Sequence, residues 1–317
     1  MTYFVLMNYI KRTLVLFLFT FLYLNGFGQS DFTEMRQLLS NSKWSAVLPK
    51  VDQYLKKNPD SDTAMLIKAE AYWGLGKGQE AYMNVSSVIE KNPKFADAYY
   101  LRGSLLVTAG QPVQGKNDLA MAMKYMTNDS LRKHILLTRS SANLATMNYQ
   151  ASIDDCKAGL LLDSVGHGFF SNLAMAYNEM GLPDSALPWL YRSYALDSTL
   201  FYTVMNIGFV LSSKKDYAGS MEWFDKAIKL DPDAAYSYSN RAYAKLKLGK
   251  PSDALTDVNK SISLDKTNSY AFRNRALIYL EMGKKDKACD DLKKAIELGF
   301  REQYGKEVDE LLKENCQ

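Results

Sequence analysis

The chain has 317 residues, 47% of them hydrophobic and 12% aromatic, so it can bury a substantial core and is not expected to be disordered. Its 39 basic residues nearly balance its 35 acidic ones, which argues against a nucleic-acid-binding or a polybasic membrane-binding protein. The three cysteines, Cys156, Cys289 and Cys316, are far apart and form no CxxC pair, which predicts at least one free thiol and neither a disulfide framework nor a zinc site.

Residues 1–28 are expected to form a secretory signal peptide. Two basic residues, Lys11 and Arg12, precede an apolar run of twelve residues, and two glycines stand at the −3 and −1 positions of a cut before Gln29. Cleavage would remove two of the 39 basic residues and leave 37 against 35 acidic ones. The alternative is an uncleaved anchor helix, although the run is shorter than the roughly 20 residues that a bilayer span needs. We therefore expect an exported protein, periplasmic or associated with the cell envelope, which contacts a membrane only if this helix is retained.

After the signal segment the sequence repeats itself with a period of 34 residues. That period is the length of a helix-turn-helix unit, which cannot bury its apolar face alone and must stack on its neighbours. A degenerate unit is expected at 29–61. Seven further units follow, at 62–95, 96–132, 133–166, 167–200, 201–234, 235–268 and 269–302. Residues 303–317 are expected to form a capping helix, apolar at Val308, Leu311 and Leu312 and charged elsewhere.

Each unit carries small or turn-forming residues at fixed places. Glycine suits the turn between the two helices because it adopts φ > 0 without a Cβ penalty, and proline suits the start of the second helix because its missing N–H is not needed there. The turn glycines are Gly76, Gly110, Gly181, Gly249 and Gly283, and the prolines are Pro112, Pro183 and Pro251. Small residues recur at positions 8 and 20 of the unit, as in Ala242 with Ala254, which predicts close approach of the two helices.

This pattern resembles the tetratricopeptide repeat (TPR), whose consensus has small residues at positions 8 and 20, glycine at 15 and proline at 32. The unit at 201–234 shows the resemblance in Gly208, Tyr217, Phe224, Ala227 and Pro232. The resemblance covers nearly all of the chain after residue 28 and implies an all-α fold, a right-handed α-solenoid of about eight units. Two departures are a three-residue excess near 127–132 and Met147 in place of the turn glycine.

Positions 7 and 23 of the unit face each other across the hairpin in the TPR fold, and this chain matches them by chemistry. Arginine is matched with aspartate in Arg102 with Asp118, Arg139 with Asp155, Arg241 with Asp257, and Arg275 with Asp291. An apolar residue is matched with tryptophan in Leu173 with Trp189 and in Ile207 with Trp223, and Lys68 with Asn84 is polar on both sides. Since an unpaired buried charge costs roughly 3–5 kcal/mol, we interpret the charged residues as structural rather than catalytic.

Residues that could support catalysis or bind a metal are scarce. The only histidines, His134 and His167, lie in no HExxH or nucleophile motif and are expected on the surface or between repeats. The glycine-rich stretch 74–78 could bind phosphate in another context, but here it occupies a turn between helices. We therefore expect no enzymatic activity, no cofactor, no metal and no small-molecule substrate.

The resemblance implies that the first helix of each unit lines a concave groove. Position 6 is asparagine in four consecutive units, Asn172, Asn206, Asn240 and Asn274, and position 2 is tyrosine in three, Tyr202, Tyr236 and Tyr270. An asparagine amide both donates and accepts, which suits the backbone of an extended peptide, and we expect these amides to be solvated in the free protein. The other interpretation is that asparagine is only the TPR consensus at this position. Met205, Phe209 and Tyr243 would make the groove apolar, which suits a helix or an extended hydrophobic peptide.

The sequence thus predicts a non-enzymatic scaffold or adaptor of the cell envelope that binds a protein or peptide in its groove. The alternative is a membrane-anchored or self-associating structural TPR protein.

Overall fold

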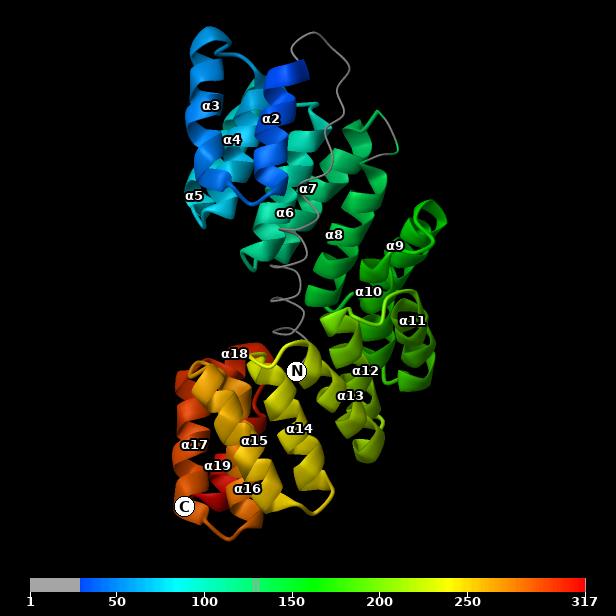
Figure 1. Ribbon diagram of the computed structural model, residues 1–317, viewed down its shortest axis with the longest axis vertical. Helices are drawn as coiled ribbons and strands as arrows, with labels where there is room; N and C mark the ends of the chain where they lie inside the picture. The colour runs from blue at the N-terminus through cyan, green and yellow to red at the C-terminus, as the bar shows by residue number, and fades with distance from the viewer. Residues whose placement is uncertain (1–28, 128, 130, 317) are drawn as a thin grey trace. The chain divides into compact units, whose positions relative to one another are not determined.

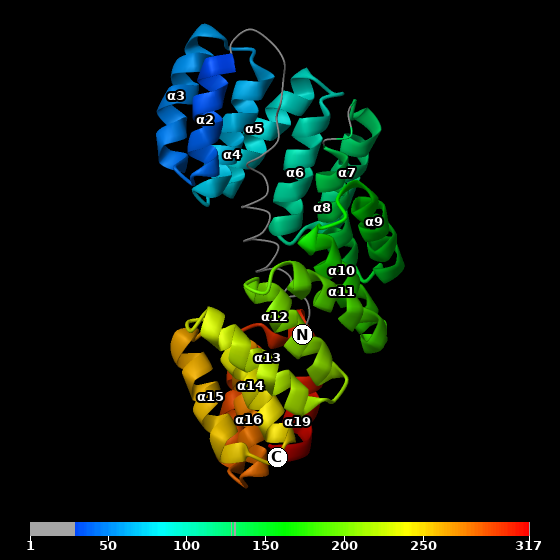
Figure 2. The same ribbon diagram turned by 45° about the vertical axis from the view of Figure 1, so that its right-hand side comes forward.

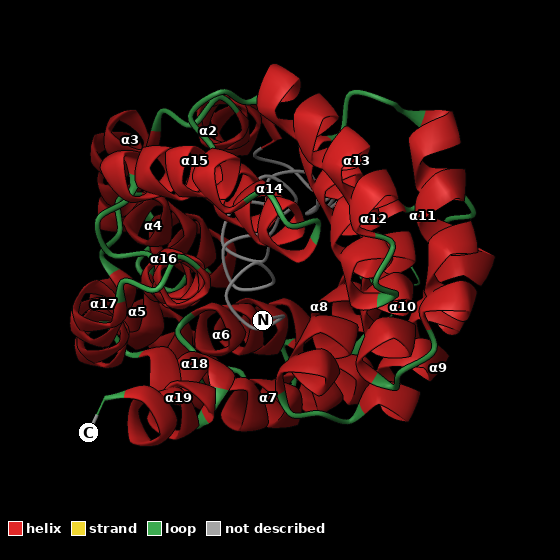
Figure 3. Cartoon of the chain, turned by 90° about the horizontal axis from the view of Figure 1, so that it is seen from below, coloured by secondary structure: helices red, strands yellow, loops and turns green. Residues whose placement is uncertain are grey.

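The computed structural model describes residues 29–127, 129 and 131–316, and every regular element among them is an α-helix (Figure 1, Figure 3). The predicted signal segment lies outside the described residues. The chain divides into two compact units, one ending at Asn172 and the other beginning at Leu173. The first contains α2 (Gln29–Ser40), α3 (Trp44–Lys57), α4 (Asp62–Gly74), α5 (Gly78–Lys91), α6 (Ala96–Thr108), α7 (Pro112–Tyr125), α8 (Arg132–Ala145), α9 (Tyr149–Leu162) and the start of α10 (His167–Glu179).

The C-terminal unit contains the rest of α10 and the helices that follow it. They are α11 (Pro183–Leu196), α12 (Phe201–Ser213), α13 (Tyr217–Leu230), α14 (Ala235–Lys247), α15 (Pro251–Leu264), α16 (Ser269–Glu281), α17 (Lys285–Glu297), α18 (Phe300–Tyr304) and α19 (Glu307–Asn315). Within each unit consecutive helices pack on one another as antiparallel hairpins, as α14 to α16 show in Figure 2. The predicted all-α hairpin fold is confirmed in both units.

The turn between the two helices of a hairpin reverses through a residue with positive φ. Gly249, between α14 and α15, has φ +71°, and the next helix begins with Pro251 at its first turn. Ser42, Met147 and Lys215 take the same turn at φ +56°, +57° and +66°, so three hairpins keep the geometry without a glycine. These three residues are held in a region that costs about 1–2 kcal/mol for a non-glycine residue.

Small residues let the helices of a hairpin approach closely, as predicted. Ala242 of α14 and Ala254 of α15 are fully buried in one cluster with Val258. At Gly208 of α12 there is no room even for a methyl group, because a Cβ would lie 2.7 Å from the ring of Phe224 on α13. The cores of the hairpins therefore depend on the small residues that define the repeat.

The four predicted ion pairs are all present. In each, Nε and Nη2 of the arginine donate to the two carboxylate oxygens of the aspartate sixteen residues later, at 2.6–3.0 Å. Ile207 and Trp223 share an apolar cluster, as the alternative pairing requires. Lys68 does not bind Asn84; it binds Asp52 at 2.7 Å, and Asn84 donates to the carbonyl of Glu80.

Three of the arginines also bind a residue sixteen positions earlier, a contact that the repeat pattern did not predict. Nη1 of Arg241 donates to Asp225 at 2.7 Å, and Nη1 of Arg275 donates to Asn259 at 3.0 Å. Nη1 of Arg102 donates to Ser86 at 3.3 Å. Each arginine thus joins the second helix of its own hairpin to that of the preceding hairpin.

The cysteine spacing indicated no disulfide framework, but the structure contains one disulfide bond and leaves one thiol free, as the odd count requires. Cys289 of α17 is bonded to Cys316, the residue after α19, and only Cys156 is a free thiol. The predicted cap is formed by α18 and α19, with Val308 buried and Leu311 and Leu312 packed against the same apolar cluster. No spacing rule could pair these cysteines, because the pairing depends on how the cap folds back onto α17.

Within the described ranges no helix is long and apolar enough to cross a membrane. In the same residues no group of three or more His, Cys, Asp or Glu side chains could hold a metal ion. His134 is buried and its ring lies 6.4 Å from that of Tyr100 on α6, so it lies between repeats, as expected.

Candidate functional site

The candidate residues lie on the first helices of successive hairpins. We call the N-terminal helix of each hairpin its first helix. In the C-terminal unit the first helices that carry candidate residues are α12, α14 and α16. They carry the predicted site residues Tyr202, Asn206, Phe209, Tyr236, Asn240, Tyr243, Tyr270 and Asn274. Asn172 is the last residue of the N-terminal unit and is described with that unit.

The asparagines do not face solvent. Asn274 has no exposed surface; its Nδ2 donates to the carbonyl of Ser239 on α14 at 3.0 Å, and its Oδ1 accepts from Arg273 at 2.8 Å. Asn172 is equally buried, and its Nδ2 donates to the hydroxyls of Ser140 and Ser141 on α8 at 2.7 and 2.9 Å. Both amides therefore join a first helix to the preceding first helix, and the expectation of solvated amides is wrong for them.

Asn206 and Asn240 are also buried, at 5% and 3% exposure. The Oδ1 atom of Asn240 has no hydrogen-bond partner among the described residues. A buried amide oxygen without a donor is unfavourable, because most buried polar atoms in folded proteins are paired. Oδ1 of Asn172 also lacks a partner among the described residues, so two asparagines of this column have an acceptor that is not used in holding adjacent helices together.

The aromatic residues are more accessible than the asparagines. Tyr202, Phe209, Tyr236 and Tyr243 are each partly exposed, and we call these four side chains the aromatic face. Burial raises the pKa of Tyr236 well above its usual range, so its phenol stays protonated at neutral pH. The ring of Tyr202 lies 5.2 Å from that of Phe201 and the ring of Tyr243 lies 6.3 Å from that of Tyr217, so neighbouring rings support both side chains.

Two predicted groove residues are not part of this face. Tyr270 is only 7% exposed, its ring lies 5.5 Å from that of Tyr304 on α18, and burial raises its pKa to about 12. Met205 is buried, and its sulfur accepts from the Ser237 hydroxyl at 3.1 Å. Met205 therefore packs between α12 and α14, and the expectation that it lines an open groove is wrong.

Sequence reasoning missed the environment of Arg273 on α16. The side chain is 7% exposed, and its guanidinium carbon lies 5.3 Å from the ring centre of Tyr243 and 5.6 Å from that of Tyr270. Its Nη2 donates to the carboxylate of Glu307 on α19. The signal for this pair was a separation of 34 residues, one repeat period, but Glu307 lies beyond the last predicted unit.

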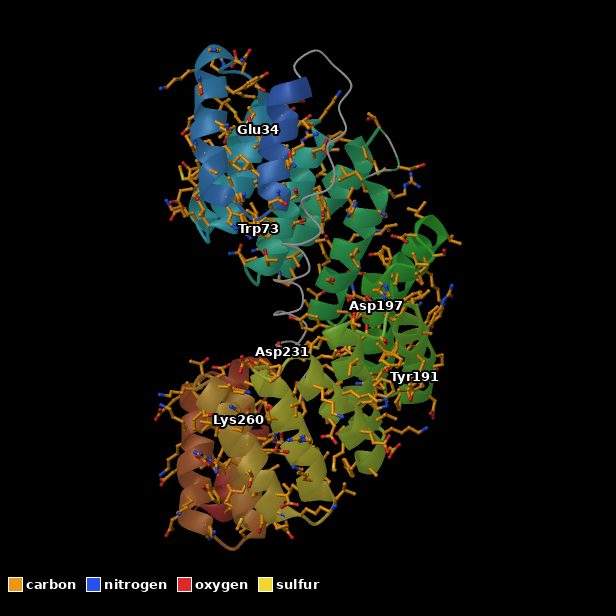
Figure 4. The ribbon with its side chains drawn as sticks, in the orientation of Figure 1. Glu34, Trp73, Tyr191, Asp197, Asp231 and Lys260 are labelled. Atoms are coloured by element: carbon orange, nitrogen blue, oxygen red, sulfur yellow. A yellow bond between two sulfur atoms is a disulfide. The ribbon has the colours of Figure 1, made fainter. Side chains whose placement is uncertain are left out.

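A second feature that was not predicted is a recess in the N-terminal unit. Its volume is about 670 Å³, and it lies between the α4–α5 turn and the end of α6. Trp73, which is labelled in Figure 4, and Tyr82 form aromatic walls, and Leu105 and Leu106 lie among the apolar lining. Arg102 covers one side of the Tyr82 ring, with its guanidinium carbon 5.8 Å from the ring centre.

Matches between the sequence and protein-family models also support the hairpin fold. A family model described as TPR repeat matches residues 208–249, and one described as tetratricopeptide repeat matches residues 272–298. The chain is a tetratricopeptide-repeat protein. No curated protein sequence matches this TPR chain well enough to count as a relative.

Solved TPR structures resemble the chain in fold. A tetratricopeptide repeat protein from Parabacteroides merdae has a TM-score of 0.68 at 18% identity, over 81% of this chain and 99% of that one. A chain of the APC/C hetero-tetramer Cut9–Hcn1 also has a TM-score of 0.68, at 16% identity, over 98% of this chain and 58% of that one. Yeast Tom70 has a TM-score of 0.64 at 14% identity, over 98% and 69%. At these identities the likeness establishes the fold and no shared partner.

Proposed function

We propose that this TPR chain is an exported, non-enzymatic scaffold that holds a protein or peptide partner on the aromatic face of its first helices. A TPR scaffold is suited to protein–protein interaction in general, and the Cut9–Hcn1 chain similar to it comes from a hetero-tetramer. To this general role the proposal adds a binding surface and a compartment.

The observation that carries the proposal is the contrast between the two columns of candidate residues. The asparagines are buried between first helices, whereas Tyr202, Phe209, Tyr236 and Tyr243 keep part of their surface exposed. Tyrosine offers a large contact area with few rotatable bonds and a polar tip, which is why it is enriched at protein interfaces. The aromatic face can therefore contact a partner without disturbing the contacts between repeats.

The compartment is supported by two independent features. Residues 1–28 have the order of a secretory signal, and Cys289 is disulfide-bonded to Cys316. Disulfides form and persist mainly in oxidising compartments. The intact mass of the protein from its native envelope should correspond to a chain that begins at or near Gln29. Retention of residues 1–24 would contradict export by cleavage and favour the membrane-anchored alternative.

The binding surface is tested by comparing variants in pull-downs from a cell-envelope extract, with the captured proteins quantified by mass spectrometry. Tyr202→Ala with Tyr236→Ala removes two rings of the aromatic face. Met83→Ala with Tyr191→Ala is the control, because both side chains are exposed, at 61% and 41%, and lie on the second helices α5 and α11. We expect the first pair to reduce capture of a specific partner at least tenfold and the control pair to leave it unchanged.

Asn206→Ala with Asn240→Ala forms the third arm of the experiment. If a peptide backbone engages both amides, each contact contributes about 0.5–1.5 kcal/mol, and loss of the pair should weaken binding by about fivefold to about 150-fold. Loss only in the tyrosine pair would favour a partner that uses the rings alone. Equal capture by all variants, with unchanged melting temperatures, would contradict the proposal and direct attention to self-association, measured by sedimentation.

A further inference from the structure

The last hairpin is closed by a segment that has no counterpart elsewhere in the described part of the chain. Helices α18 and α19 follow α17, and both pack on it (Figure 1). Glu307 on α19 stands 34 residues after Arg273 on α16, which is one repeat period. In sequence register, α19 therefore takes the place of the first helix of a further hairpin.

This cap covers groups at the end of the row of first helices. The carboxylate of Glu307 accepts from Nη2 of Arg273, whose guanidinium lies between the rings of Tyr243 and Tyr270. The ring of Tyr304 lies 5.5 Å from that of Tyr270. The Glu307 side chain is about half exposed, so water can reach this ion pair from the side of α19. Removal of α19 would take away the only carboxylate that the structure places on Arg273 among the described residues.

Few non-covalent contacts hold α19. The helix has nine residues, and Val308 is its only fully buried side chain. Leu311 and Leu312 are partly buried against the same cluster, and Asp309 accepts from Arg301 of α18. Helices this short are not stable alone in water, so α19 depends on its attachment to α17. The Cys289–Cys316 disulfide supplies that attachment at the far end of the helix, and both cysteines are partly exposed to solvent.

We propose that the Cys289–Cys316 disulfide is a redox latch that keeps α19 over Arg273 and Tyr270, and that its reduction uncovers them. A dithiol reductant breaks the S–S bond and supplies two electrons and two protons, which form two thiols, while the dithiol becomes a disulfide. The released α19 then exchanges between docked and undocked states. The uncovered guanidinium between two tyrosine rings presents a place for a carboxylate group in the position that Glu307 leaves.

The latch goes beyond the proposed function and needs no partner for its test. Hydrogen exchange of the full chain is measured by mass spectrometry with and without dithiothreitol. We expect amides of α19 to exchange at least tenfold faster after reduction, while amides of α14 and α15 keep their rates. Cys156 does not complicate the comparison, because burial raises the pKa of its thiol to about 12 and keeps it unreactive.

A second measurement reports on Arg273 itself and uses no reductant. The variant Cys289→Ser with Cys316→Ser is treated with phenylglyoxal, and modification is located by mass spectrometry. Arg273 should react at least fivefold faster than in the oxidised native chain. Arg275, on the same helix and bonded to Asp291, is the internal control and should react equally in both.

Three results would overturn the latch. Unchanged exchange in α19 after reduction would show that the helix is held without the disulfide. Faster exchange throughout α12 to α17 would show that the disulfide stabilises the whole unit rather than the cap. Equal reactivity of Arg273 in the native chain and the serine variant would show that the cap does not cover it.

Discussion

The pairing of Arg275 with Asp291 gives the sharpest test of the repeat register. Nε and Nη2 of Arg275 donate to the two oxygens of Asp291 at 2.7 Å, and the Asp291 side chain is only 8% exposed. Arg275→Leu would leave this carboxylate facing an apolar group. Breaking a buried ion pair by removing one partner costs roughly 3–5 kcal/mol. Because the arginine is itself partly exposed, we expect a loss near the lower end, about 3 kcal/mol.

The double variant Arg275→Leu with Asp291→Trp should recover part of that loss. The fold already accommodates an apolar residue opposite tryptophan, since Ile207 and Trp223 lie in one apolar cluster. We expect about 1–2 kcal/mol to return, because the stranded charge disappears while the contacts to Asn259 and to the ring of Phe272 remain lost.

The assay is urea denaturation of the two single variants and the double variant, followed by circular dichroism. Asp291→Trp alone serves as the other corner of the cycle. In that variant Arg275 keeps Asn259 and can reach water, so it should lose less than Arg275→Leu. A coupling energy below about 0.5 kcal/mol would mean that the two positions act independently, and the interpretation of matched pairs across the hairpin would be wrong.

Further predictions concern the disulfide, the buried histidine and the tight glycine. Cys316→Ser should favour the undocked state of α19 by about 3.5 kcal/mol in oxidising buffer, because the bond closes a loop of 27 residues and so restricts the undocked segment; hydrogen exchange of α19 in the variant and in the oxidised native chain measures this. Burial lowers the pKa of His134 to about 4, so its stabilising effect is complete above pH 6.5 and is lost as pH falls towards 4. The variant His134→Gln should flatten that part of the stability profile by about 2 kcal/mol in thermal melts. Gly208→Ala should cost about 1–3 kcal/mol, because its Cβ would press on the Phe224 ring, and an unchanged melting temperature would contradict the close packing.

The sequence contained enough information for the contacts that recur in most repeats. Arg241 and Asp257 lie sixteen residues apart, as do Arg275 and Asp291, and this repetition alone marks the two residues as partners. The same spacing in the other direction joins Asp225 to Arg241, but the sequence did not predict this contact because the residue at that place varies among aspartate, asparagine and serine. A varying partner leaves no pattern in a single sequence.

Contacts that occur once could not be predicted in this way. Cys289 meets Cys316 and Arg273 meets Glu307 only because the chain turns after α17 at Gly299, with φ +81°, and α19 then packs back on α17. The cap is present in one copy, so no internal comparison fixes its register. The burial of the asparagines could not be predicted either. A column of asparagines marks one side of the first helices, but repetition does not say whether that side faces solvent or the preceding helix.

The structure divides the side chains of each first helix by task. Position 7, occupied by residues such as Arg241, reaches the second helices on both sides, and position 6, as in Asn274, reaches the preceding first helix. Both positions help to hold hairpins together and must suit the fold before they can suit a ligand. What remains for recognition is the partly exposed aromatic face, which includes Tyr202. A partner would therefore be selected by side chains that are not fully buried between hairpins, and Tyr202→Ala should change binding while leaving the melting temperature of the protein nearly unaltered.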